Sequence, residues 1–185
     1  MVKQPKYEKV EVEVHSGLAA ETHLLLDGDM KEIRSLFLMS QTAPTFAINN
    51  RGSVVNSEIL SVPQEIYVDE IYTIKFSNNF ILQCTPGTPI MGIDNWILAV
   101  NAKKGDKVLG AMYSENTGVK GRVFEIENVK KEYKTLKTPV YFFIAKDGNI
   151  LLPSYYDDGE KSELTFICIS QWYIINMKGK VNINR

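Results

Sequence analysis

A pair of strand-like runs joined by a turn restricts the fold more than any other feature of this sequence. Residues 66–76 (IYVDEIYTIKF) are rich in β-branched and aromatic residues, which suit a pleated, half-buried surface. Ser77, Asn78 and Asn79 supply a turn signal, since asparagine tolerates the left-handed backbone conformation. Residues 80–84 (FILQC) then return as a second apolar run. The pattern predicts a β-hairpin.

Short strand-like runs of this kind recur along the chain. Residues 10–14 (VEVEV) alternate strictly, which is typical of a half-buried strand. Enrichment in β-branched and aromatic residues predicts further strands at residues 122–128, 139–145, 164–170 and 172–175. A turn signal stands at residues 146–149 (KDGN), and the polar residues 114–121 and 154–162 are expected to form exposed loops.

Helical signals are few and short. Only residues 30–38 and 128–133 are helix-like, and no long period of 3.6 residues is present. The sequence therefore predicts an all-β protein of many short strands. Its 185 residues suggest one domain, or one domain with an appended arm.

The amino-acid composition and net charge limit the kinds of function that this chain can have. The hydrophobic content of 44% is ample for a core, and a net charge of -1 does not favour general binding to nucleic acid or to a membrane surface. The chain has no apolar run of 18 residues, and its first 15 residues lack the apolar centre of a secretory signal. We therefore expect a cytoplasmic protein without a transmembrane helix.

Candidate metal and cofactor residues are sparse. Cys84 and Cys168 lie far apart and lack metal-ligand spacing, so we predict two free, buried thiols in a reducing compartment. His15 and His23 form no zinc-binding motif, and the chain has neither a Walker loop nor a GxGxxG motif. We expect no metal and no small-molecule cofactor.

Three motifs in order suggest a known family. The first is residues 17–33 (GLAAETHLLLDGDMKEI). The second, within residues 80–109, has a strand ending in Cys84-Thr85-Pro86, then Pro89, Trp96 and Ala99, and finally KGDKVL. The third is residues 164–184, with Gly179 five residues before Asn184. Together they resemble the Hint domain, the fold shared by inteins and hedgehog autoprocessing domains.

The resemblance carries expectations about the fold. It covers residues 17–184, a minimal length for a Hint domain without an inserted homing endonuclease. It implies a flat β horseshoe whose ends, near Gly17 and Asn184, lie close together. Residues 1–16 would then be an added N-terminal arm that contributes a strand.

The family's chemistry begins with an acyl shift, in which a Cys or Ser at the first position attacks the preceding carbonyl. Here Gly17 stands at that position and has no side chain, while Ser16 would serve if the register moved by one residue. Thr85 is present in the second motif, where a Thr and a His usually polarise the scissile bond. Thr88 replaces that His, and a hydroxyl cannot shuttle protons near neutral pH as imidazole does.

The last motif is altered as well. The resemblance makes Asn184 the residue that cyclises in the final step. However, Ile183 replaces the usual His before it, and Arg185 after it is not a nucleophile. Cys168 falls at a position where one subclass of inteins carries its nucleophile, although the Trp that accompanies it in that subclass is missing. We favour a buried structural cysteine in an apolar strand over that role, and residues 139–141 compete for the same alignment.

Two functions of different classes follow, with enzymatic activity left open. The leading expectation is a degenerate mini-intein that does not splice and acts as a structural or interaction module with a protein partner or assembly. Family analogy would place it in a phage or other mobile-element protein, and so in a virion. The alternative is an atypical self-processing intein, with Cys168 or Ser16 as nucleophile, Thr85 as activator and Asn184 as the cyclising residue. A third possibility is an unrelated β-rich binding module.

Overall fold

The computed structural model describes residues 16–37, 43–60, 64–142, 145–157 and 159–170, and almost all regular structure in them is β-strand. The expected strands at residues 10–14 and 172–175, and the residues Asn184 and Arg185, lie outside the described residues. The strands are β1 (Leu18–Ala19), β2 (His23–Leu26), β3 (Asp29–Glu32), β4 (Ala43–Ile48), β5 (Val54–Ile59), β6 (Gln64–Phe76), β7 (Ile81–Cys84), β8 (Pro89–Met91), β9 (Trp96–Leu98), β10 (Lys107–Ser114), β11 (Gly118–Phe142), β12 (Asn149–Asp157) and β13 (Ser162–Ser170). Helix α1 (Ile33–Phe37) and the 3-10 turn η1 (Ala99–Asn101) complete the list. The all-β prediction is confirmed.

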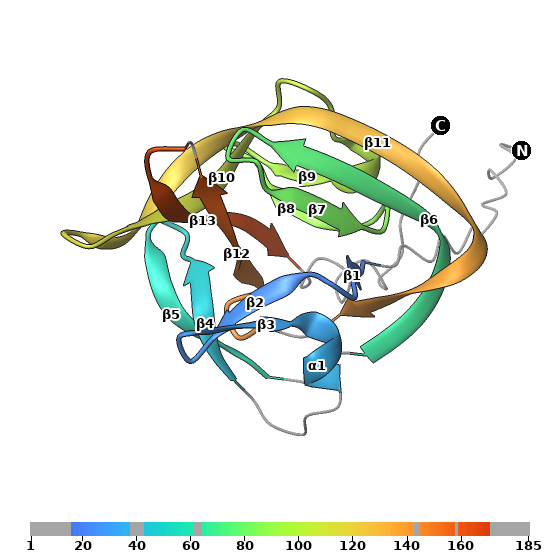
Figure 1. Ribbon diagram of the computed structural model, residues 1–185, viewed down its shortest axis with the longest axis horizontal. Helices are drawn as coiled ribbons and strands as arrows, with labels where there is room; N and C mark the ends of the chain where they lie inside the picture. The colour runs from blue at the N-terminus through green and yellow to red at the C-terminus, as the bar shows by residue number, and fades with distance from the viewer. Residues whose placement is uncertain (1–15, 38–42, 61–63, 143–144, 158, 171–185) are drawn as a thin grey trace, which may run out of the picture.

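One large sheet organises the molecule. Its strand order is β1-β7-β6-β11-β10-β13-β8-β9, with β12 paired to β13 and β1 paired to β11 as well as β7. Figure 1 shows β6 and β11 as a long ribbon that curves around the other strands, as expected for a horseshoe. Two small hairpins, β2–β3 and β4–β5, lie beside it.

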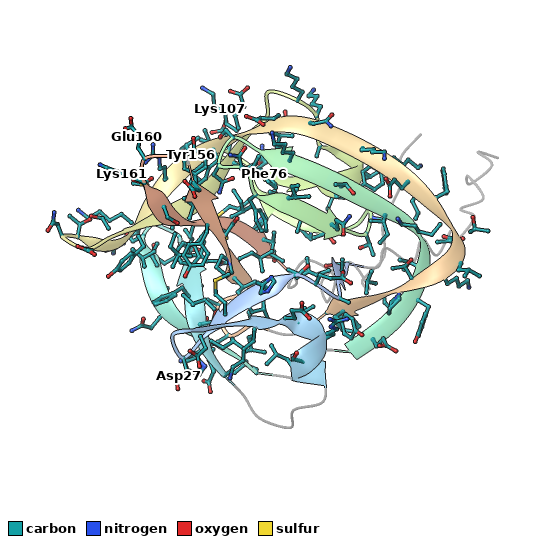
Figure 2. The ribbon with its side chains drawn as sticks, in the orientation of Figure 1. Asp27, Phe76, Lys107, Tyr156, Glu160 and Lys161 are labelled. Carbon is teal, nitrogen blue, oxygen red and sulfur yellow. The ribbon has the colours of Figure 1, made fainter. Side chains whose placement is uncertain are left out.

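The predicted hairpin is confirmed as β6–β7. The Phe76 N–H donates to the Phe80 carbonyl at 2.9 Å, and Asn79 adopts a φ of 60°. Asn78 is buried, and its amide nitrogen donates to the Thr165 hydroxyl at 2.8 Å, which ties the turn to β13. Figure 2 shows Phe76 inside the fold and Asp27 at the outer β2–β3 turn.

Both helix predictions need correction. Residues 128–133 form no helix, because they lie in β11 and pair with residues 70–75 of β6. Residues 30–38 are helical only from Ile33 to Phe37, since Asp29–Glu32 forms strand β3. Asp27 and Gly28 cause this difference: with φ of 50° and 84° they make a tight turn that pairs β3 with β2. In both places strand pairing overrides weak helical propensity.

The other predicted strands agree with the strands of the structure over most of their length. Residues 122–128 and 139–142 belong to β11, residues 164–170 belong to β13, and Ala145 forms an isolated bridge with Ile59. Residues 146–148 form the predicted turn, with Gly148 at a φ of 73°. The predicted loops are too long: residues 114 and 118–121, and residues 154–157, are paired strand ends of two hairpins.

Strand β13 passes between two groups of buried apolar side chains. Ile167 and Ile169 pack in the larger cluster, which also holds Leu18, Cys84 and Ile90. Phe166 and Cys168 point to the other face and pack with Ile48, Ala111 and Leu151. Burial on both faces explains why residues 166–169 (FICI) form a continuous apolar run and not an alternating one.

Two findings concern membranes and metals. In the described ranges, no helix is long and apolar enough to cross a membrane. The same ranges contain no group of three or more His, Cys, Asp or Glu side chains that could hold a metal ion.

Candidate functional site

The fold brings Gly17, Thr85 and Thr88 together. Leu18, the first residue of β1, pairs with Cys84 of β7, and the Thr85 N–H donates to the Gly17 carbonyl at 3.0 Å. Residues 85–88 then make a tight turn, closed by the Thr88 N–H donating to the Thr85 carbonyl at 3.1 Å. Backbone N–H groups of Ala99 and Val100 in η1 donate to the Thr88 and Pro86 carbonyls, both at 2.9 Å. Backbone hydrogen bonds therefore fix the turn to Gly17 on one side and to η1 on the other.

The Thr88 hydroxyl is the centre of this group. It accepts the Gly17 N–H at 3.2 Å and donates to the Gly17 carbonyl oxygen at 3.2 Å. The Thr85 hydroxyl oxygen lies 3.1 Å from it. Since a hydroxyl has one proton and two acceptor positions, Thr85 donates to Thr88 when Thr88 donates to Gly17. Thr85 and Thr88 are buried, so the network is closed to solvent.

Cys84 is a neighbour that the motif comparison did not identify as part of the site. Its thiol is fully buried, and burial raises its pKa to about 12, against a smaller opposing effect of a hydrogen bond with Thr88. The thiol is therefore protonated at neutral pH and a poor nucleophile. The only sequence signal for this contact is the spacing of four residues between Cys84 and Thr88 around a Pro-Gly turn.

Ser16 lies at the start of the described chain and is also buried. Its hydroxyl has no hydrogen-bond partner among the described residues. The Thr88 contact is made with the next peptide nitrogen, that of Gly17. Thr88 therefore contacts the residue that the resemblance places at the family's first position, and the choice between Gly17 and Ser16 for that position stays a prediction.

Cys168 has a separate environment. It faces the second apolar cluster, and its Sγ donates to the Asn149 side-chain oxygen at 3.2 Å. Burial raises the pKa of its thiol well above the usual range. Asn149 in turn accepts the Ile48 N–H at 2.8 Å and donates to the Ile48 carbonyl at 2.9 Å, which links β12 to β4. These contacts place Cys168 in a buried, hydrogen-bonded setting, and its role stays a prediction.

Asn184 lies outside the described residues, so its closeness to Gly17 stays a prediction. Two surface hollows among the described residues are not lined by the site residues. The larger, of about 570 Å³, lies between the β4–β5 turn and the β10–β11 hairpin, and the smaller, of about 280 Å³, lies near His23 and Tyr155.

Comparison with known proteins supports the fold. No family model matches the chain, and no curated protein matches its sequence. The structure is similar to a DnaB intein from Synechocystis sp. PCC 6803, with a TM-score of 0.61 and 13% identity over 84% of this chain and 98% of that one. It is also similar to the DnaX mini intein from Spirulina platensis (TM-score 0.60, 17% identity, 83% and 98% covered) and to a bacterial intein-like domain from Clostridium thermocellum (TM-score 0.59, 16% identity, 84% and 98% covered).

This chain has the Hint fold. The match to nearly the whole length of these inteins confirms the resemblance at the level of the fold and leaves activity to be argued from the site. In this Hint domain the Thr88 hydroxyl accepts the Gly17 N–H. The boundary placed at residue 17 stays a prediction.

Proposed function

We propose that this Hint domain neither splices nor cleaves itself, and that it serves as a structural or interaction module. One observation carries the proposal. At the position of the family's nucleophile stands Gly17, whose amide N–H is held by the Thr88 hydroxyl. The residues of the site are thus used to fix the backbone.

The direction of this hydrogen bond opposes cleavage. To release an amine, the peptide nitrogen must gain a proton, because its lone pair is delocalised into the amide. Thr88 instead presents an acceptor to the nitrogen and directs its own proton to the Gly17 carbonyl oxygen. The Ser16–Gly17 amide is therefore held as a hydrogen-bond donor through its N–H, while the Thr88 proton goes to the carbonyl of the next amide, Gly17–Leu18, and not to the nitrogen that would leave. A threonine also cannot act as the proton shuttle that a histidine provides at neutral pH.

The two cysteines do not replace the missing nucleophile. Both are buried, and burial raises the pKa of each thiol far above neutrality. Cys168 also hydrogen-bonds to Asn149, on the face of β13 opposite Ile167 and Ile169. Neither thiol therefore has the exposed, electropositive surroundings that activate cysteine.

A bulged part of the β6–β11 ribbon, which exposes large side chains among charged residues, supports an interaction role. Tyr133 pairs with Glu70 and Thr138 with Val68, so residues 134–137 bulge out opposite Asp69. Three large side chains in this stretch are exposed: Tyr67 by 58%, Tyr133 by 72% and Leu136 by 83%. Such groups on a sheet ribbon suit contact with another protein. We keep a protein partner, and a cytoplasmic or virion location, as proposals.

Autocleavage at Ser16 is the second candidate. It is favoured by one observation, the buried Ser16 hydroxyl without a hydrogen-bond partner among the described residues. In that mechanism the Ser16 oxygen attacks the carbonyl of residue 15, an ester replaces the amide, and the hydroxyl proton ends on the Ser16 amine.

The proposed function is tested with a fusion in which folded reporter proteins precede residue 1 and follow residue 185. We expect a single full-length product on gels after expression and long incubation, with no ligated pair of reporters. Hydroxylamine cleaves esters, so a fragment starting at Ser16 that disappears in Ser16→Ala would establish the second candidate. A ligated reporter pair would contradict the proposal outright.

A further inference from the structure

The space beside Gly17 is taken by a side chain of another strand. β1 and β11 lie side by side, with Ala19 opposite Val140 and Leu18 opposite Tyr141. Val140 is fully buried. A Cβ atom placed on Gly17 would lie 2.7 Å from Val140 Cγ2 and 3.0 Å from Val140 Cβ. These separations are shorter than carbon atoms tolerate without a shift of one partner.

The backbone itself does not require glycine at this position. Gly17 is not among the glycines with positive φ, so an L side chain could adopt its backbone conformation. The Thr85 methyl would lie 3.4 Å from the added Cβ, which is close to ordinary contact. Among the described residues, apart from the chain neighbours of Gly17, only atoms of Val140 are closer than this.

Val140 cannot easily move aside. It is β-branched, so its χ1 angle is restricted. Its backbone is paired on both sides, with Ile66 of β6 and with Ala19 of β1. Val140 Cγ2, the closer of the two clashing carbons, is bonded directly to Val140 Cβ. That Cβ moves only when the strand moves. Relief of the contact therefore needs a displacement of β1 or β11.

We propose that Val140 is the residue that closes this Hint site to a first-position side chain, so that Gly17 and Val140 form a matched pair. The inference rests on the proposed function, since it explains how the fold accommodates a site without a nucleophile. It adds that any nucleophile introduced at residue 17 requires a smaller residue at position 140. The packing of β11 against Gly17 therefore leaves no room for a nucleophilic side chain at the first position.

A double-mutant cycle on folding stability tests the pair. The full chain is compared with Gly17→Ala, Val140→Ala and the double variant, and melting temperatures are measured. Gly17→Ala alone should lower the melting temperature by roughly 5 °C, as overpacking does. In the Val140→Ala background the same change should lower it by clearly less, because the 2.7 Å contact with Cγ2 is removed and only the 3.0 Å contact with the Cβ of residue 140 remains.

Val108→Ala is the matched control, since Val108 is also a fully buried strand valine. Gly17→Ala should keep its full effect in that background. Equal effects of Gly17→Ala in the wild-type and Val140→Ala backgrounds would overturn the proposal. If Gly17→Ala does not fold, recovery of folded protein in the double variant supports it, and failure of the double while Val140→Ala folds overturns it.

The cycle is independent of cleavage. Self-cleavage by the wild-type chain would defeat the proposed function and leave the coupling measurable. Additive stability effects would defeat the role of Val140 and leave a non-cleaving domain in place.

Discussion

The Thr88 hydroxyl holds the backbone of Gly17, at a position where the resemblance to the Hint family expects a histidine. The motif comparison predicted that Thr88 stands where a histidine acts, and the structure places its hydroxyl on the Gly17 amide. The sequence did not indicate that the hydroxyl contacts both the N–H and the carbonyl of one residue. That arrangement depends on the pairing of β1 with β7, which brings residues 17 and 88 together across 71 positions.

Removing the Thr88 hydroxyl should therefore affect stability. Thr88→Val keeps the shape of the side chain and leaves the buried Gly17 N–H unpaired. We expect a loss of roughly 2 kcal/mol in the free energy of unfolding, measured by denaturant titration. Thr88→Ser retains the hydroxyl and should lose less. A valine variant as stable as the wild type would show that the hydroxyl does not hold β1 in place.

The two thiols give a second prediction at this scale. Burial raises the pKa of Cys84 to about 12, so at pH 8 its thiol stays protonated and enclosed. A thiol reagent such as Ellman's should find no reactive group in the folded protein and both cysteines in guanidinium chloride. Rapid reaction of one thiol in the folded state would reopen the possibility of a cysteine nucleophile.

Among the elements, the hairpin β6–β7 was predictable because its signals are local. Two β-branched runs and an asparagine turn suffice to specify it. The helix predicted at residues 128–133 failed because the pairing of β11 with β6 joins residues more than 50 positions apart. The contact of Val140 with Gly17 and the link from Cys168 to Asn149 were missed for the same reason, since no local pattern signals either.

Asn149 offers a test of how the elements are joined. Its side chain is buried and satisfies both the N–H and the carbonyl of Ile48, in β4. Asn149→Ala should lower the free energy of unfolding by roughly 3 kcal/mol, because two buried backbone groups lose their partner. Asn128→Ala, at an exposed position of β11, is the control and should change it by less than about 0.5 kcal/mol. Equal effects would refute the link between β4 and β12.

For the molecule as a whole, the order of three weak motifs predicted the fold better than any element did. Each motif recurs by chance, yet their order reflects which strands must meet in a Hint domain, and the similarity to solved inteins confirms that fold. The proposal of an inactive site could be made from the residue types at Gly17, Thr88, Ile183 and Arg185. The hydrogen bonds and packing around Gly17 could not be predicted, because they depend on contacts that the fold creates.

We infer that this site holds the Ser16–Gly17 peptide bond intact. The inference can be checked by the intact mass of the purified chain after prolonged incubation at neutral pH, with and without a strong thiol or hydroxylamine. We expect one species at the full-length mass of 21.0 kDa in every condition. A thiol-dependent fragment whose N-terminal residue is Gly17 would contradict it.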